Sequence, residues 1–167
     1  MSKMCREDLS KCIIESLEAD PYVSYEEPEV TEGFITIDFY VGGIITASRN
    51  INFEGRIVAF DNGYYIMSFL GTTAAKKAIP KLIRFTELLN TYLSSGDINV
   101  DAENERVFFR TYERFWNEHA FDEETFIELL HAHIDANIDY KDSIYLLIKG
   151  ASGADSQIKK LKKRDVI

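Results

Sequence analysis

Hydrophobic and polar residues recur with two different periods along the chain, and the first period is helical. Small or apolar side chains fall on one helical face at Leu9, Cys12, Ile13, Ser16 and Leu17. Asp20-Pro21 follows this stripe, and a residue before proline disfavours the helical conformation. We therefore expect an amphipathic helix over residues 6–19.

The period changes to two at residue 34. One face of the extended chain carries Ile35, Ile37, Phe39 and Val41, and the other carries Phe34, Thr36, Asp38 and Tyr40. Gly42-Gly43 predicts a turn, and strand segments are predicted over 44–53 and 56–60. Asp61-Asn62-Gly63 predicts a hairpin into a strand over 64–71, because asparagine and glycine tolerate the positive φ of tight turns. The stretch 21–33 has no predicted element.

Helical spacing returns between Thr72 and Tyr92, with Pro80 inside the pattern. Because proline is tolerated in the first turn of a helix, we expect this helix to begin near Ile79, after a turn or short helix over 72–78. Gly96 predicts the end of the helix. Alternating segments at 97–101 and 106–112 then predict a second hairpin.

The last helix is predicted to open at Asp122, whose carboxylate suits an N-cap. Its buried stripe is expected at Phe126, Leu129, Leu130, His133 and Ile134. A further apolar segment, residues 143–150, ends at Gly150.

Antiparallel strands interrupted by helices predict an α+β fold in the order α-β-β-β(-β)-α-β-β-α, with helices on one face of an antiparallel sheet. The opposite face is expected to carry Phe34, Tyr40, Tyr64, Ile66, Phe108, Arg110 and Tyr112. A face this aromatic leaves two interpretations open. Either a second layer of the same chain covers it, or it forms a dimer or ligand-binding surface.

The 167 residues are 46% hydrophobic and 28% charged, a globular balance that favours one domain. We place that domain at residues 1–154 and expect residues 155–167 to form a basic, solvated tail. The tail holds five basic and two acidic side chains, a formal charge of +3. Because the whole chain has a formal charge of −9, the body carries −12. Such a body repels phosphate groups, which disfavours nucleic-acid binding.

Two cysteines without a CxxC spacing, no secretory signal and no apolar run of transmembrane length predict a cytoplasmic protein without a membrane partner. Cys5 and Cys12 are about 10 Å apart on one helix, too far for a disulfide. Both are expected to be inert, because neither has an adjacent histidine to activate it.

Side chains suited to metal binding or catalysis are few. Histidine occurs only at His119, His131 and His133. On a helix His131 and His133 diverge by about 200°, so they cannot share a metal, whereas His131 and Asp135 could. Two ligands without a third do not define a metal site. We expect no metal, no cofactor and no catalytic residue.

The second half of the chain resembles the YbjN family. The resemblance rests on "LLNTYLSSG" at a helix end, "GDINVD" and "VFFR" in the hairpin strands, "FDEETFIELL" at a helix start and a closing "YKDSIYLLIKGASGAD". It covers residues 80–155 and implies the fold of the type III secretion chaperones, often paired as a homodimer. Asn90, Gly96, Arg110 and Gly150 match the family pattern and are expected to be structural. The family offers no catalytic residue to transfer.

These observations together favour a non-enzymatic protein that binds another polypeptide or a second copy of itself, as a chaperone-like protein or a sensory transduction regulator. Its acidic body would steer it toward basic clients. A metal-dependent or small-molecule enzyme using His131 and Asp135 is the alternative hypothesis. A toxin-neutralising partner protein is a third.

Overall fold

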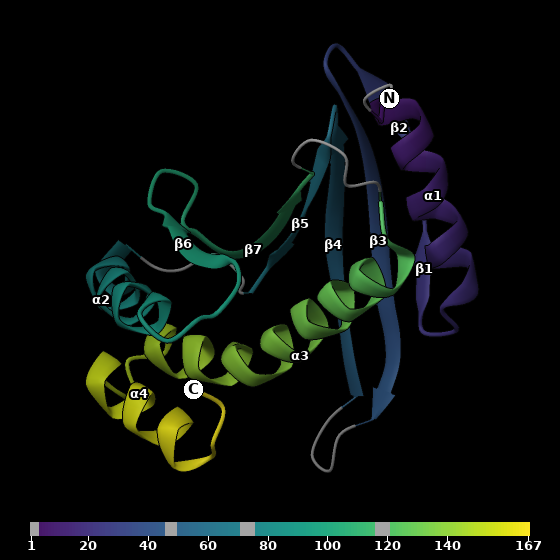
Figure 1. Cartoon of the computed structure of the whole chain (residues 1–167). Helices are drawn as coiled ribbons and strands as arrows, with labels where there is room; N and C mark the ends of the chain where they lie inside the picture. Colours follow the sequence, from purple (N-terminus) through teal and green to yellow (C-terminus); the bar gives the residue numbers. More distant parts are fainter. Residues whose placement is uncertain (1–3, 46–49, 71–75, 116–120) are drawn as a thin grey trace. The chain divides into compact units, whose positions relative to one another are not determined.

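The computed structural model describes residues 4–45, 50–70, 76–115 and 121–167 (Figure 1). The chain divides into two compact units, each formed by two separate stretches of sequence. Unit 1 comprises residues 1–68 and 111–133, and unit 2 comprises residues 69–110 and 134–167. The single domain expected over residues 1–154 stays a prediction.

Unit 1 contains an antiparallel sheet built around one long strand pair. β3 (Phe34–Ile45) pairs with β4 (Asn50–Phe60), and β4 pairs with β5 (Gly63–Phe69). The short strands β1 (Val23–Tyr25) and β2 (Glu29–Thr31) pair with different stretches of β3. β7 (Arg106–Arg114) follows β5 in the strand order, and its residues from Thr111 belong to unit 1.

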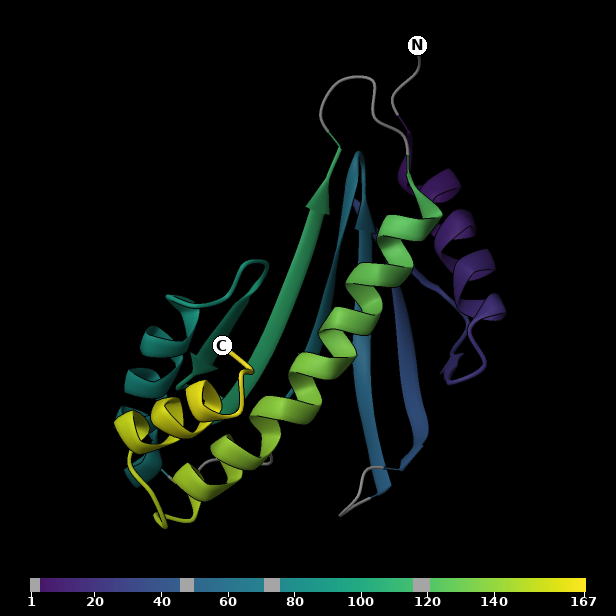
Figure 2. The same ribbon diagram turned by 60° about the horizontal axis from the view of Figure 1, so that its bottom comes forward.

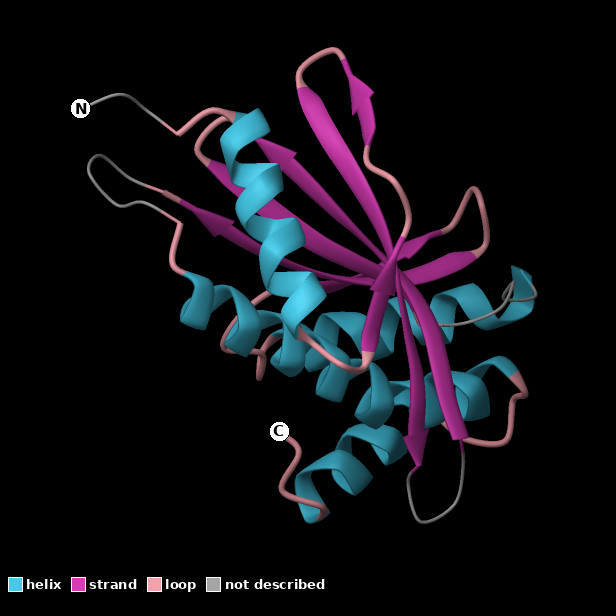
Figure 3. Cartoon of the chain, turned by 90° about the vertical axis from the view of Figure 1, so that its right-hand side faces the viewer, coloured by secondary structure: helices cyan, strands magenta, loops and turns pink. Residues whose placement is uncertain are grey.

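Two helices cover the same face of this sheet. α1 (Arg6–Ala19) packs against β1, β3 and β4 (Figure 3). The first turns of α3 (Glu123–Ile148) reach the inner face of β5, where the rings of Phe126 and Tyr64 meet edge-on at 5.4 Å between centroids. The two helices are themselves joined, because Oδ2 of Asp20 lies 2.8 Å from Nε2 of His131. The buried apolar side chains of α1 and β3 are Leu9, Ile13, Leu17, Ile35, Ile37, Phe39 and Val41.

Two predictions about the strands of unit 1 are wrong. β1 and β2 lie in residues 21–33, where no element was predicted, because three-residue strands are too short to show a period. Gly42-Gly43 is not a turn, since β3 continues through it with a register shift between Val41 and Ile44, as in a β-bulge. The predicted segments 44–53 and 56–60 are therefore not separate strands; residues 46–49 lie outside the described part of the chain.

Gly55 lies inside β4, opposite Phe39. A Cβ at this position would collide with the Phe39 ring, which is fully buried. The predicted hairpin after β4 is confirmed, but its loop is Asp61-Asn62, because Phe60 pairs with Gly63. Asn62 takes the positive φ of 65° that asparagine tolerates in tight turns.

Unit 2 gathers a hairpin and three helices, one of them the second part of α3, around one apolar core. β6 (Asp97–Asp101) pairs with the first half of β7. The 3-10 turn η1 (Lys76–Ala78) leads into α2 (Ile79–Asn90), which lies beside α4 (Ala154–Lys163) (Figure 2). The core of unit 2 is formed by Leu70, Ala78, Leu82, Phe85, Leu89, Ile98, Val107, Phe109, Tyr140, Ile144, Leu147, Ala154, Ile158 and Leu161. The predicted start of the helix near Ile79 is confirmed; residues 72–75 lie outside the described part.

Asn90, the last residue of α2, substitutes for a neighbouring strand at the edge of β6. Its Nδ2 donates to the carbonyl of Ile98 at 2.9 Å, and its Oδ1 accepts the Ile98 N–H at 2.8 Å. A side-chain amide that pairs with a strand in this way satisfies edge backbone groups that would otherwise be open to another chain. The helix ends here, so Gly96, with a φ of 77°, precedes β6 and is not the helix stop that was expected.

The C-terminal part of the chain also differs from expectation. α3 is one helix of 26 residues, so the apolar segment at 143–150 continues the last predicted helix. Asp122 accepts the Thr125 N–H at 2.8 Å, as expected of an N-cap. Residues from Ala154 form α4, whose side chains Gln157, Ile158 and Leu161 are buried, so the expected solvated tail is wrong.

The α+β class with an open antiparallel sheet is confirmed. α1 and the start of α3 cover one face of the unit 1 strands, and α2 lies against the unit 2 hairpin. Within the part of the chain that the structure describes, no helix of unit 1 covers the other face of its strands. Among the described residues, no helix combines the length and the apolar character needed to cross a bilayer.

Candidate functional site

The outer face of the unit 1 sheet is defined by alternation. Ile35, Ile37 and Phe39 point inward and are buried, so Phe34, Thr36, Asp38 and Tyr40 point outward. The register places Phe60 opposite Phe34 and Val58 opposite Thr36. On the next strand, Tyr65 lies opposite Val58. Paired residues in a sheet share a face, so all of these side chains lie on the outer face.

Tyr112 extends this row of side chains onto β7. The Phe115 N–H donates to the Asn62 carbonyl at 2.9 Å, which fixes the local register of the two antiparallel strands. Counting three residues along each strand from this bond places Tyr65 opposite Tyr112. One row of the outer face therefore runs through Thr36, Val58, Tyr65 and Tyr112.

We call Phe34, Val58, Phe60, Tyr65 and Tyr112 the aromatic patch. Tyr112 is 63% exposed and Phe34 41% exposed, whereas Val58 is only 5% exposed. Its aromatic neighbours lie on the same solvent-facing side, so Val58 forms the floor of the patch. Gly63 also lies on this face, and a Cβ there would meet the Phe60 ring at 2.8 Å. The glycine thus gives the Phe60 ring room to lie against the strand.

Acidic side chains border the aromatic patch. Glu26, Asp38 and Glu54 lie around Tyr40, and the Glu26 carboxylate accepts the Tyr40 hydroxyl at 2.6 Å. This hydrogen bond and the surrounding negative charge raise the pKa of Tyr40 to about 12. Arg56 pairs in a bidentate manner with Asp38, at 2.6 and 2.8 Å. We call Glu26, Glu29, Asp38 and Glu54 the acidic strip, in which Arg56 offsets one charge.

The acidic strip belongs to a strongly acidic unit. The stretches that make up unit 1 contain 18 acidic and 6 basic side chains, whereas those of unit 2 contain 10 acidic and 13 basic ones. The formal charges are therefore −12 and +3. A concentration of one sign raises the local concentration of oppositely charged ligands.

The outer face of the unit 2 hairpin is smaller and more polar. Phe108 is half-buried opposite Asn99, and Arg110 pairs with Asp97 at 3.1 and 3.2 Å. The predicted outward orientation of Phe108, Arg110 and Tyr112 agrees with their exposure, as does that of Phe34 and Tyr40.

Tyr64 and Ile66 were placed on the wrong face. They pair with Ala59 and Ile57, and both are buried in the core, at 1% and 0% exposure. Burial raises the pKa of the Tyr64 hydroxyl. The outward residues of this strand are Tyr65 and Met67. The facing of the β5 residues follows from alternation only when Ile57 and Ala59 of β4 are known to point inward. The sequence does not reveal this, because the residue between them, Val58, is apolar as well.

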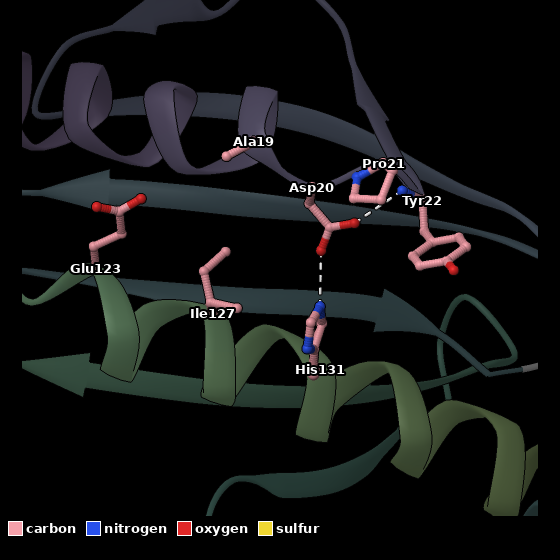
Figure 4. A pocket seen from close by; sticks show the side chains of 7 residues that line it. All are labelled: Ala19, Asp20, Pro21, Tyr22, Glu123, Ile127 and His131. Atoms are coloured by element: carbon pink, nitrogen blue, oxygen red, sulfur yellow. Dashed lines mark hydrogen bonds and ion pairs between the residues drawn. The ribbon is translucent and has the colours of Figure 1, made fainter.

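His131 pairs with a partner that helical spacing could not reveal. Its Nε2 lies 2.8 Å from Oδ2 of Asp20, whose Oδ1 accepts the Tyr22 N–H at 2.9 Å (Figure 4). The structure gives no bond between His131 and Asp135, the pair considered for a metal. Within the described ranges, no three histidine, cysteine or acidic side chains are placed to hold a metal ion. His119 lies outside the described residues.

His133 is fully buried, on the opposite side of α3 from His131. Its ring nitrogens lie 2.8 Å from Oγ of Ser68 and 3.2 Å from Oγ1 of Thr111. Burial lowers the pKa of His133 to about 3, so the ring is neutral at neutral pH. The divergence of the two histidines is confirmed, and His133 joins α3 to β5 and β7 inside unit 1.

Cys5 and Cys12 are free thiols, as expected from their spacing. Burial raises the pKa of Cys12, which favours its unreactive protonated form.

Comparison of the chain with models of protein families, with curated proteins and with solved structures gave no match.

Proposed function

We propose that the protein is non-enzymatic and binds a basic segment of another polypeptide across the outer face of unit 1. The observation that supports this most directly is the position of the aromatic patch next to the acidic strip, on the face without a helix of that unit. The resemblance to the YbjN family agrees with this proposal, as does the expected cytoplasmic location.

The aromatic patch supplies the apolar part of the interaction. Tyrosine and phenylalanine are enriched in protein interfaces because they bury a large area with few rotatable bonds. Tyr112 is the most exposed member, and the partly exposed Phe34 lies at the other side of the patch. A client side chain between them would cover the floor at Val58.

The acidic strip and the charge of unit 1 select the client. Glu26, Glu29 and Glu54 attract lysine or arginine, and exposed aromatic rings also favour cations. Acidic segments and phosphate backbones are repelled by the same charges, so nucleic acid is not the expected partner.

The first experiment measures binding of two labelled peptides of equal length by fluorescence anisotropy. In one peptide lysine alternates with valine, and in the other glutamate alternates with valine. We expect the lysine peptide alone to bind, with an affinity that falls as salt is added. Tyr112→Asp should weaken its binding about tenfold or more, because it removes an exposed aromatic anchor and places a charge in the patch.

Tyr145→Asp is the matched control. Tyr145 is 50% exposed on α3 in unit 2 and is not part of the aromatic patch, so this variant should bind the lysine peptide normally. Circular dichroism should show both variants folded. Equal weakening by the two substitutions, or equal binding of the two peptides, would contradict the proposal.

Light scattering separates a client from a second copy of the chain. If the aromatic patch is a homodimer interface, the wild-type protein is a dimer, Tyr112→Asp is a monomer, and peptide binding does not depend on the patch. That outcome would overturn the proposed client binding.

A further inference from the structure

A cleft of about 260 Å³ lies on the helix-covered side of unit 1. One wall is α3, which presents Glu123, Ile127 and His131 at intervals of four residues, one helical turn apart (Figure 4). The other wall is the end of α1 and the residues that follow it, from Ala19 to Tyr22. We call this the Asp20 cleft, and no part of it belongs to the aromatic patch.

The order of side chains along the α3 wall is polar, apolar and polar. Glu123 stands at one end, Ile127 in the middle and His131 at the other end (Figure 4). Ala19 and Pro21 add to the apolar middle of the cleft. A ligand that fits this order has a polar group at each end and an aliphatic chain between them.

The His131 end of the cleft accepts hydrogen bonds. The Asp20 side chain is 3% exposed and receives both the Tyr22 N–H and the His131 ring. Because a carboxylate can only accept, Nε2 carries the hydrogen of this bond, and in the neutral tautomer of the ring Nδ1 is then an acceptor. The His131 side chain is 53% exposed, so a ligand can reach this nitrogen.

The Glu123 end is negatively charged. Its exposed carboxylate has no hydrogen bond or ion pair with any residue that the structure describes. Among the described residues, the lining of the cleft holds two carboxylates and no lysine or arginine, in a unit with a formal charge of −12. The C-terminal end of α1, which carries partial negative charge, also lies here.

Size limits the ligand further. Pockets for drug-sized ligands have volumes of roughly 300–1,000 Å³, so this cleft suits a smaller molecule. Glu123 and His131 are about 12 Å apart along the helix axis. Hydrogen bonds of about 2.8 Å at both ends leave a gap that a short alkyl chain can span.

We propose that the Asp20 cleft binds a linear aliphatic diamine in its diammonium form. One ammonium pairs with the Glu123 carboxylate, the other donates to Nδ1 of His131 beside the Asp20 carboxylate, and the methylene chain lies against Ile127. This site is independent of polypeptide binding on the opposite face of the sheet.

The test is a titration of the full chain by NMR, following the Ile127 methyl groups and the His131 ring. The probes are cadaverine, pentylamine and pentanediol, which share a five-carbon chain and differ in the number of cationic ends. We expect saturable shifts with cadaverine, binding about fivefold weaker with pentylamine, because one ion pair is lost, and no saturable shift with pentanediol.

Glu123→Gln should reduce cadaverine binding to the level of pentylamine. Glu124→Gln is the matched control, because it removes the same charge from the neighbouring exposed residue outside the cleft. Both residues are exposed, so neither change should unfold the protein. Equal cadaverine affinity in the two variants, or an equal response to cadaverine and pentanediol, would overturn the proposal, as would the absence of any saturable shift.

Discussion

The two units have the same kind of packing and differ in the side chains on the strand face that the helices leave exposed. Each places helices on one face of antiparallel strands and carries a cross-strand arginine–aspartate pair on the other face. In unit 1 the pair is Arg56–Asp38, and in unit 2 it is Arg110–Asp97. Unit 1 adds the aromatic patch and a charge of −12, whereas unit 2 has the smaller hairpin face and a charge of +3.

The two units also differ in where their exposed apolar side chains lie. Unit 2 has one apolar core that includes residues of α4, and Asn90 closes its strand edge. Its exposed apolar side chains include Ile83 on α2 and Tyr145 on α3. Unit 1 keeps aromatic side chains exposed, which costs solubility unless a ligand uses them or charge offsets them. Its acidic surroundings supply that charge.

The largest expected effect tests whether α4 is part of the core of unit 2. Leu161→Ala should lower the free energy of unfolding by about 2–5 kcal/mol, because it removes buried methyl groups and leaves a cavity. Urea unfolding measures the change. Lys159→Ala, at an exposed position of the same helix, should change it by no more than about 0.5 kcal/mol. Equal changes in the free energy of unfolding for the two variants would mean that residues 155–167 form a solvated tail after all.

The second-largest effect is expected at the close contact between Gly55 and the Phe39 ring in unit 1. Gly55→Ala should cost about 1–3 kcal/mol, because the new methyl group displaces the buried Phe39 ring. Hydrogen exchange should quicken in β3 and β4. Gly42→Ala is the control, since a Cβ at that position of β3 meets only Oδ1 of Asn52, at an ordinary contact distance of 3.5 Å. If Gly55→Ala proved as harmless as the control, the Phe39 ring would not be fixed by packing.

Acid should destabilise unit 1 through His133. Its pKa falls from an ordinary 6.5 to about 3 on folding, so below pH 6.5 the unfolded chain binds a proton that the folded chain does not. Stability is therefore lost as the pH falls from 6.5 toward 3, by about 1.4 kcal/mol per pH unit. His133→Gln should flatten this dependence, measured by urea unfolding at a series of pH values. His131→Gln should leave the loss due to His133 in place; flattening by both variants would contradict the assignment.

The smallest expected effect is the coupling free energy within each of the two ion pairs. Double-mutant cycles on Arg56–Asp38 and Arg110–Asp97 should each give a coupling of about 0.2–1 kcal/mol, because both pairs are partly exposed. The shorter Arg56–Asp38 pair should give the larger coupling, and salt should reduce both. A coupling well above this range in either cycle would mean that the pair is more shielded from water than its exposure indicates.

Local sequence signals were sufficient wherever a structural feature depends on neighbouring residues. The stripe from Leu9 to Leu17 identified α1, Pro80 placed the start of α2, and the asparagine in the hairpin loop marked the turn at Asn62. Each of these depends on backbone geometry or on spacing within one element. The α+β class followed from their order.

Features that depend on contacts between distant residues were decided only by the tertiary structure. β4 is apolar at Ile57, Val58 and Ala59, so only strand pairing shows that Tyr64 and Ile66 point inward and Tyr65 outward. The short strands β1 and β2 exist because β3 offers them a partner. The many lysines of α4 suggested a solvated tail, and only the structure showed that its apolar residues are buried in the core of unit 2.

The candidate sites divide in the same way. The sequence by itself determined Phe34 and Tyr112 as outward aromatic residues, because strict alternation along one strand fixes the side of each residue. Only the tertiary structure joined His131 to Asp20, 111 residues earlier in the chain, and placed Tyr112 in one row with Tyr65. The physical reason is that the position of a residue within a strand or helix determines which face its side chain lies on. The residue that it contacts depends on how the tertiary fold brings distant segments together.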